Sequence, residues 1–140
     1  GFREAWTQHQ DDPLRALSPV KQPLHGAVRC MFVAPSDAEA ERIARPAYKQ
    51  WFDSLVALWV RRGDYPPISL SNDYDSARKS GSLVVGSPQT VREELLAQHR
   101  VAGFDYLVLQ LAFGSLGHDN EMRSLELFAR EIKPALEAAG

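Results

Sequence analysis

Two apolar runs, each long enough for one strand, constrain the fold of this 140-residue chain more than any other feature. Residues 27–34 (AVRCMFVA) and 104–111 (FDYLVLQL) are apolar at most positions. Strands that are covered on both faces, as in a parallel sheet, have this pattern. A helical pattern follows each run. Such alternation predicts right-handed βαβ units, a parallel sheet and therefore an α/β fold.

Start and stop signals define the helices between and after these runs. Ser36 begins an S-x-x-E capping box, which predicts a helix running towards Arg62. Pro46 should split or kink that helix near Arg42, whose carbonyl loses its donor. A second helix is predicted after the sequence GSP at residues 86–88, and Gly103 is a plausible terminator.

The last helix is predicted from about Asn120 to Ala139, because apolar residues repeat there every three or four positions. Pro134 should kink it. Residues 1–26 are predicted to be the tail of a helix followed by an irregular connection that is interrupted by prolines. No internal repeat divides the chain, so residues 1–140 are treated as one unit.

Residues 63–86 form a candidate lid insertion. Residues 63–81 are rich in Gly, Pro, Ser, Asn and Asp, and residues 83–85 offer only a very short apolar extended piece. A turn-like stretch of this length inside a compact domain is usually a functional or mobile loop. Only two full strands are then visible. Two parallel strands cannot close a sheet, so the chain is interpreted as part of a larger fold.

Composition excludes several functions and suggests none. Hydrophobic residues make up 44% and charged residues 24%, which is ordinary for a soluble domain. The formal net charge is −2, so the chain has no positive electrostatic field that would attract nucleic acid or acidic membranes. No apolar run is long enough to cross a membrane. The single cysteine fits a reducing, cytoplasmic compartment, and the histidines lack metal-ligand spacing, so no metal site is expected.

Three stretches of the chain, taken in order, resemble the C-terminal part of the bacterial luciferase-like flavin-dependent monooxygenases. The resemblance rests on a valine-containing strand with a DAEA helix start and an ARPAY-type helix, on a GSP helix start, and on a G-x-D strand with a SLELFARE-type final helix. Ser115 departs from the family pattern, in which a second glycine is common in that loop. The stretches are residues 29–51, 81–91 and 102–136.

This resemblance implies a (β/α)₈ TIM barrel, of which the chain would be a C-terminal fragment carrying the last two βα units with an insertion between them. Residues 27–34 would be the seventh strand and residues 104–111 the eighth. The N-terminal portion of the barrel would be missing. Active sites of such barrels lie at the carboxyl ends of the strands. We therefore expect functional residues at 35–37, 63–86 and 112–119.

The resemblance also implies a chemistry for the full-length protein. Family members oxidise a small organic substrate with O2, using reduced FMN that a separate flavin reductase supplies. The fragment alone should be inactive, because the bed of the flavin ring would lie largely on earlier strands. A lid over the barrel mouth would shield the reactive flavin from water.

Several residues are candidates for functional roles, and for some of them a structural role is the alternative. Gly86 and Ser87 could hold a phosphate at a helix start, although a simple N-cap is the commoner role. Phe113 and Gly114 could line the flavin edge, with barrel-core packing as the alternative for Phe113. His118 is the catalytic candidate. The candidate substrate and lid residues are Arg62, Tyr65, Tyr74 and Arg78.

Two other hypotheses remain open at this point. One is a relative of the same fold that uses a deazaflavin and only transfers hydride. The other is a non-catalytic α/β module that binds a partner or forms a homo-oligomer, because a partial sheet is expected to expose strand edges.

Overall fold

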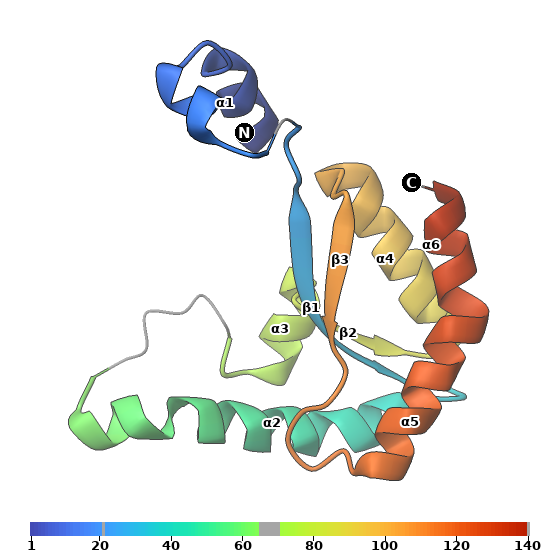
Figure 1. Ribbon diagram of the computed structural model, residues 1–140. Helices are drawn as coiled ribbons and strands as arrows, with labels where there is room; N and C mark the ends of the chain where they lie inside the picture. Colours follow the sequence, from blue (N-terminus) through green and yellow to red (C-terminus); the bar gives the residue numbers. More distant parts are fainter. Residues whose placement is uncertain (21, 65–70, 140) are drawn as a thin grey trace.

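The structure, a computed structural model, describes residues 1–20, 22–64 and 71–139 and contains a three-stranded parallel sheet with helices on both faces (Figure 1). The strands are β1 (Gly26–Val33), β2 (Leu83–Gly86) and β3 (Tyr106–Gln110). The helices are α1 (Phe2–Gln8), a 3₁₀-helix (Pro13–Leu17), α2 (Asp37–Arg62), α3 (Tyr74–Ser80), α4 (Pro88–Ala102), α5 (His118–Leu127), a π-helical turn (Phe128–Ile132) and α6 (Lys133–Ala139).

The predicted α/β class and the parallel pairing of the two apolar runs are confirmed. Val28 of β1 is in register with Val108 of β3. The very short extended piece expected at residues 83–85 is a third strand of the sheet, β2, whose Leu83 pairs with Cys30 of β1. Four residues give too short an alternation to be recognised as a strand from sequence.

The spatial strand order is β2-β1-β3, with the first strand in the middle. Because α2 follows β1 on one face of the sheet and α4 follows β2 on the other, the described part of the chain has the winding of an open, doubly wound sheet. The α/β class and the parallel sheet are as expected, and the closure of a TIM barrel stays a prediction.

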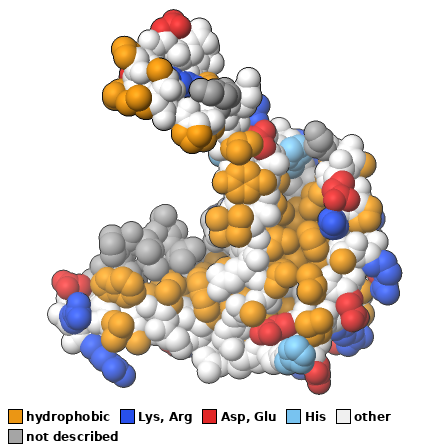
Figure 2. All heavy atoms as spheres, in the orientation of Figure 1, with side chains coloured by type: hydrophobic (Ala, Val, Ile, Leu, Met, Phe, Trp, Pro, Cys, Tyr) orange, Lys and Arg blue, Asp and Glu red, His pale blue; other side chains and the backbone are white. Residues whose placement is uncertain are grey.

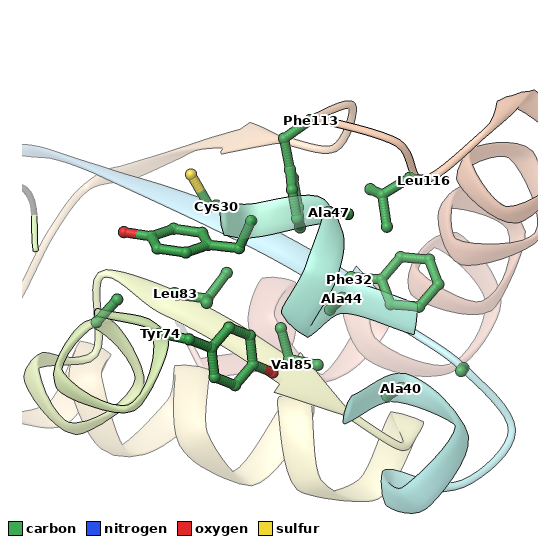
Figure 3. Close-up of a cluster of buried hydrophobic side chains, with 13 residues drawn as sticks. Cys30, Phe32, Ala40, Ala44, Ala47, Tyr74, Leu83, Val85, Phe113 and Leu116 are labelled. Atoms are coloured by element: carbon green, nitrogen blue, oxygen red, sulfur yellow. The ribbon is translucent and has the colours of Figure 1, made fainter. Parts of the chain in front are cut away.

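One face of the sheet packs against α2, α3 and the loop after β3 (Figure 3). Alanines on α2 bring its backbone close to the strands, so Phe32 and Val85 fill the space between these layers. The buried residues of this face are Cys30, Phe32, Ala34, Ala40, Ala44, Ala47, Tyr48, Tyr74, Ala77, Leu83, Val85, Phe113 and Leu116.

The other face packs against α4 and the final helical segment. Its buried residues are Met31, Val33, Val84, Val91, Leu95 and Ile132. Ser124 of α5 is completely buried, and its Oγ accepts a hydrogen bond from the backbone N–H of Val33 at 2.8 Å. Together the two faces bury the carboxyl half of β1 and all of β2.

Helix α2 begins as predicted, with the Ser36 Oγ accepting from the Glu39 N–H at 3.3 Å. It is not split at Pro46 but continues to Arg62 and ends at Gly63. Its distal half extends away from the sheet (Figure 1), and Leu58 there is 65% exposed. The buried positions of α2 run from Ala40 to Val56, and its last turn and a half are mostly exposed. None of the described helices is long and apolar enough to cross a membrane.

One segment is more ordered than predicted, and another is less regular. Residues 74–80 of the turn-like insertion form α3, whose Tyr74 and Ala77 are buried in the core. The final helix changes to a π-helical turn at Phe128–Ile132, immediately before Pro134, because this proline cannot donate to the carbonyl of Arg130. Residues 65–70 of the insertion lie outside the described residues.

Candidate functional site

The starts of two helices meet at the carboxyl ends of β1 and β2. Val33 pairs with Gly86, so the turn leading into α2 lies beside the turn leading into α4. Ser87 caps α4, and its Oγ accepts from the Thr90 N–H at 3.4 Å. This meeting of two helix N-termini is the place where a parallel α/β sheet typically binds ligands.

The Asp37 carboxylate joins the two helix starts. It accepts the backbone N–H of Ser87 at 2.6 Å and the Thr90 hydroxyl at 3.0 Å. The hydrogen bond from the Ser87 amide, followed by that from Thr90, lowers the pKa of Asp37 from its ordinary value of 3.8. The amide predicted to hold a phosphate thus already donates to a carboxylate of the same chain.

Gly86 makes this contact possible. A Cβ atom at Gly86 would lie 2.9 Å from Asp37 Oδ1 and 2.9 Å from the Thr90 side chain. Glycine is therefore required at the end of β2 for close approach of Asp37, not for a positive φ. Gly86 and Ser87 were predicted together as a cofactor site. They do lie together, but the group they contact is the carboxylate of Asp37.

A cavity of about 600 Å³ opens beside these helix starts. Asp37 and Glu131 both border it, so two carboxylates contribute negative charge to the cavity, which disfavours an anionic ligand. Its lining residues are Pro35, Ser36, Asp37, Ser87, Pro88, Gln89, Leu127 and Glu131.

Tyr74 and Arg78, the predicted lid residues on α3, are fixed in place by α2 and α4. Arg78 forms ion pairs with Glu94 at 3.0 Å and Glu41 at 3.7 Å and also donates to the Leu83 carbonyl at 3.0 Å. The Tyr74 ring is buried beneath the Arg45 guanidinium, 4.2 Å from its centroid, and burial raises the pKa of its hydroxyl. In this arrangement both side chains tie α3 to the core.

Phe113 and Gly114 pack tightly against α2. The Phe113 ring lies edge-on to Tyr48 with centroids 6.5 Å apart. Gly114 has a φ of +57°, and a Cβ atom there would lie 1.8 Å from the Ala47 carbonyl oxygen. Phe113 is buried, and Gly114 is exposed but held against the α2 backbone, so in the described structure the contacts of both residues are packing contacts.

The remaining predicted residues lie apart from these groups. His118 is the first residue of α5 and is exposed, and Arg62 is exposed near the end of α2. Tyr65 lies outside the described residues. The predicted site residues are therefore distributed over separate places and do not form one constellation in the described part of the chain.

Sequence reasoning included Asp37 only in the expected range 35–37, without a role for its carboxylate, and it missed Tyr48. The acid in the first turn of a capped helix is a recognisable feature, but its contact with an amide 50 positions away depends on strand pairing. Tyr48 contacts Trp51, Tyr74 and Phe113 and donates to the Ser71 carbonyl at 2.8 Å. Its burial raises the pKa of its hydroxyl to about 12. Tyr48 lies within the ARPAY sequence, where helical spacing alone does not distinguish it from other apolar positions.

Comparison with known proteins defines the class of fold. The chain aligns over 95% of its length, at 20% identity and a TM-score of 0.62, with the monooxygenase RslO1 from Streptomyces bottropensis. It aligns over 93%, at 23% identity and a TM-score of 0.63, with the oxygenating constituent of 3,6-diketocamphane monooxygenase from the CAM plasmid of Pseudomonas putida, a type II Baeyer–Villiger enzyme in complex with FMN. The chain covers 37% and 38% of those two proteins, respectively.

A curated relative also matches part of the chain. The uncharacterized protein y4wF from Sinorhizobium fredii (strain NBRC 101917 / NGR234) is 35% identical over 107 residues, which are 76% of this chain but 31% of that protein. No family model matches the chain. The chain thus has an α/β fold shared with part of two monooxygenases, and it spans about a third of the length of the proteins it matches.

Proposed function

We propose that the chain is part of a luciferase-like, FMN-dependent monooxygenase. The observation that carries this proposal is the likeness of fold over nearly the whole chain to two monooxygenases, one of which is in complex with FMN. The ordered motifs at residues 29–51, 81–91 and 102–136 support the same family independently of the fold. In the complete protein, reduced FMN from a separate reductase and O2 would oxidise a small organic substrate.

The complete fold is proposed to be a TIM barrel in which β1 and β3 are neighbouring strands. Their direct parallel pairing, Gly26 with Tyr106 through Cys30 with Gln110, supports this part of the proposal. The barrel proposal does not by itself explain why β2 pairs with the other edge of β1.

The described residues do not by themselves fit FMN. The Ser87 amide donates to Asp37, two carboxylates border the adjacent cavity, and the loop at Phe113 and Gly114 is packed against α2. An anionic phosphate would have to displace Asp37. We therefore propose that the bed of the flavin ring lies on the two-thirds of the relatives' length that this chain does not span.

Two exposed residues, His118 and Arg62, are then the candidates for contact with substrate or cofactor. His118 at the start of α5 is proposed to face the reacting centre of the complete protein, and Arg62 to approach an anionic group of the substrate. Tyr74 and Arg78 are proposed to anchor α3, a described part of the lid insertion, to α2 and α4.

Titration of the full-length protein with FMN in the presence of NADH and a flavin reductase tests this proposal. We expect quenching of flavin fluorescence and flavin-dependent O2 consumption above that of the reductase alone. The substitution His118→Ala should reduce the O2-coupled oxidation of substrate and leave FMN binding intact. Absence of both flavin binding and flavin-dependent O2 uptake in the full-length protein would reject the proposal.

A further inference from the structure

One polar side chain interrupts an otherwise apolar part of the sheet. Gln110 is the last residue of β3, and its side chain is half-buried. It is in register with Cys30 of β1, so the two side chains lie on the same face of the sheet. The alternation of side chains along β1 and β3 gives Gln110 five apolar or aromatic neighbours on this face, which we call the apolar strip: Val28, Cys30, Phe32, Tyr106 and Val108.

Gln110 lies at the boundary between the exposed and the buried parts of this face. Towards the amino ends of the strands, Val28 is 64% exposed and Val108 is 48% exposed. Figure 2 shows hydrophobic side chains gathered over this part of the sheet. Towards the carboxyl ends, Cys30 and Phe113 belong to the core that packs against α2 (Figure 3). The Gln110 amide is therefore next to an apolar surface and is still open to an incoming molecule.

The hydrogen bonds of the Gln110 amide leave one donor unused. Its Oε1 accepts from the Cys30 thiol, whose Sγ is 3.6 Å away. Burial raises the pKa of this thiol to about 11, so the thiol keeps its proton and directs Oε1 towards β1. The Nε2 donates to the Ala112 carbonyl at 3.5 Å, the outer limit of a hydrogen bond. Because an amide nitrogen carries two N–H donors, at least one has no partner among the described residues.

The position of Gln110 in the fold is typical of a residue that contacts a ligand. Parallel α/β folds bind their ligands at the carboxyl ends of the strands, and Gln110 ends β3. The loop at residues 112–119 follows at once and leads to His118 at the start of α5. Ligand sites are mostly apolar and contain a few polar groups that fix the orientation of the ligand. Gln110 and the apolar strip have this composition.

We propose that Gln110 positions the substrate by donating a hydrogen bond from Nε2 to an acceptor atom of an otherwise apolar molecule. This inference rests on the proposed function, because it assigns Gln110 to the site of that monooxygenase. An amide does not titrate in the physiological range, so Gln110 orients the substrate and transfers no proton. An uncharged oxygen, such as that of a carbonyl group, matches this uncharged donor, and the apolar strip contacts the remainder of the molecule.

The alternative is a structural role, in which the bond from Gln110 to Ala112 shapes the loop after β3. This bond is long and exposed to solvent, so it holds the loop weakly. The two roles also differ in a measurable way. Loss of a structural contact changes the binding of every ligand at the site alike. Loss of a positioning donor weakens only those ligands that carry a hydrogen-bond acceptor.

Two small probes of the same shape separate these roles. Cyclohexanone carries one acceptor oxygen on an apolar ring, and methylenecyclohexane has a CH2 group in place of that oxygen. Headspace gas chromatography over the full-length protein measures the Kd of each volatile probe. The variant is Gln110→Met, which keeps the length of the side chain and removes both N–H donors. The matched control is Gln50→Met, at an exposed glutamine on α2.

We expect Gln110→Met to raise the Kd of cyclohexanone about 10-fold, because one hydrogen bond to the ligand is lost. The Kd of methylenecyclohexane should stay the same or fall, and Gln50→Met should change neither value. Equal weakening of both probes would overturn the proposal in favour of the structural role. An unchanged Kd of cyclohexanone, or no binding of either probe to the unmodified protein, would overturn it outright.

A second variant covers the case in which Gln110→Met does not unfold cooperatively in urea. Gln110→Glu keeps the shape of the side chain and removes both N–H donors, and it should weaken cyclohexanone at least about 10-fold relative to methylenecyclohexane. FMN titration of the same samples distinguishes the two failures. Selective loss of cyclohexanone without FMN binding keeps the role of Gln110 and counts against the proposed function. FMN binding without that selective loss keeps the proposed function and overturns the role of Gln110.

Discussion

The two outer strands of the sheet, β2 and β3, occupy opposite environments although both pair in parallel with β1. All four residues of β2 are buried, because α2, α3 and α4 all contact this strand. In β3 no residue is fully buried, and Tyr106 and Val108 are exposed. One edge of the sheet is therefore closed by the chain's own helices, and the other is open.

This difference shows that the sequence pattern of a strand indicates how much of its side-chain surface needs to be covered. The tertiary structure determines how much of that surface is covered. β2 is short and was nearly unrecognisable in the sequence, yet it is fully enclosed. The run containing β3 has a clear pattern for a buried strand, yet within the described residues it lacks a cover. The closed side should consequently carry most of the free energy of unfolding of the chain alone.

The largest expected effect is at Gly114, where the closing loop contacts α2. In Gly114→Ala the Cβ atom would meet the Ala47 carbonyl oxygen at 1.8 Å, and alanine would adopt a φ of +57°. We expect a loss of about 3–4 kcal/mol in the free energy of unfolding, measured in urea. The control is Gly63→Ala, which has a φ of +76° but no atom within 4 Å and should lose only about 1 kcal/mol. Equal losses would show that the loop is not docked on α2.

A matched pair of valines measures the contrast between the two edges directly. Val84 on β2 is 0% exposed, whereas Val108 on β3 is 48% exposed. Val84→Ala should cost about 2–3 kcal/mol of unfolding free energy, since two methyl groups leave the core and a cavity remains. Val108→Ala should cost less than about 0.5 kcal/mol in the chain alone. Similar losses at the two positions would contradict the open edge.

Loss of the Ser124 hydroxyl tests the attachment of α5 to the buried half of β1. In Ser124→Ala the Val33 N–H, now bonded at 2.8 Å, would be left without its acceptor in the core. We expect a loss of about 1–2 kcal/mol in chemical denaturation. The exposed Ser115→Ala is the control and should be neutral. An unchanged free energy of unfolding in Ser124→Ala would show that this hydrogen bond does not attach α5 to β1.

The smallest expected effect is at Asp37, which is exposed. Its pKa is lower in the folded chain than the ordinary 3.8, so its stabilising contribution is present above about pH 4 and is lost as the pH falls through the folded-state pKa. Asp37→Asn should therefore cost below about 1 kcal/mol at pH 7, and the difference from the unmodified chain should vanish in acid. Asp11→Asn, an exposed carboxylate near α1, is the control. A loss independent of pH would indicate that charge is irrelevant at this contact.

Much of the fold could be predicted from local chemistry. Gly103 ends α4 with a φ of +59°, and Ser36 and Ser87 cap α2 and α4, because these signals depend only on neighbouring residues. The sequence shows β2 only as a short extended piece at residues 83–85. Four residues are too few to display the two-residue alternation of a strand. Pro46 was expected to interrupt α2, but packing against the sheet holds the helix together.

The candidate site was less accessible to such reasoning. The contact between Asp37 and Ser87 joins residues far apart in the chain, and only the pairing of Val33 with Gly86 brings them together. Likewise, the docking of Gly114 on Ala47 depends on where α2 crosses the loop after β3. Tyr74 and Arg78 were assigned to a loop because Gly, Ser and Asp surround them, although this segment forms α3.

Hydrogen exchange followed by mass spectrometry tests the central claim, that β2 closes one edge of the sheet while β3 leaves the other open. Backbone amides of Leu83–Gly86 should exchange only through global unfolding, and those of Tyr106–Gln110 should exchange faster by at least about 100-fold in the chain alone. Equal protection of both strands, or stronger protection of β3 than of β2, would contradict this account.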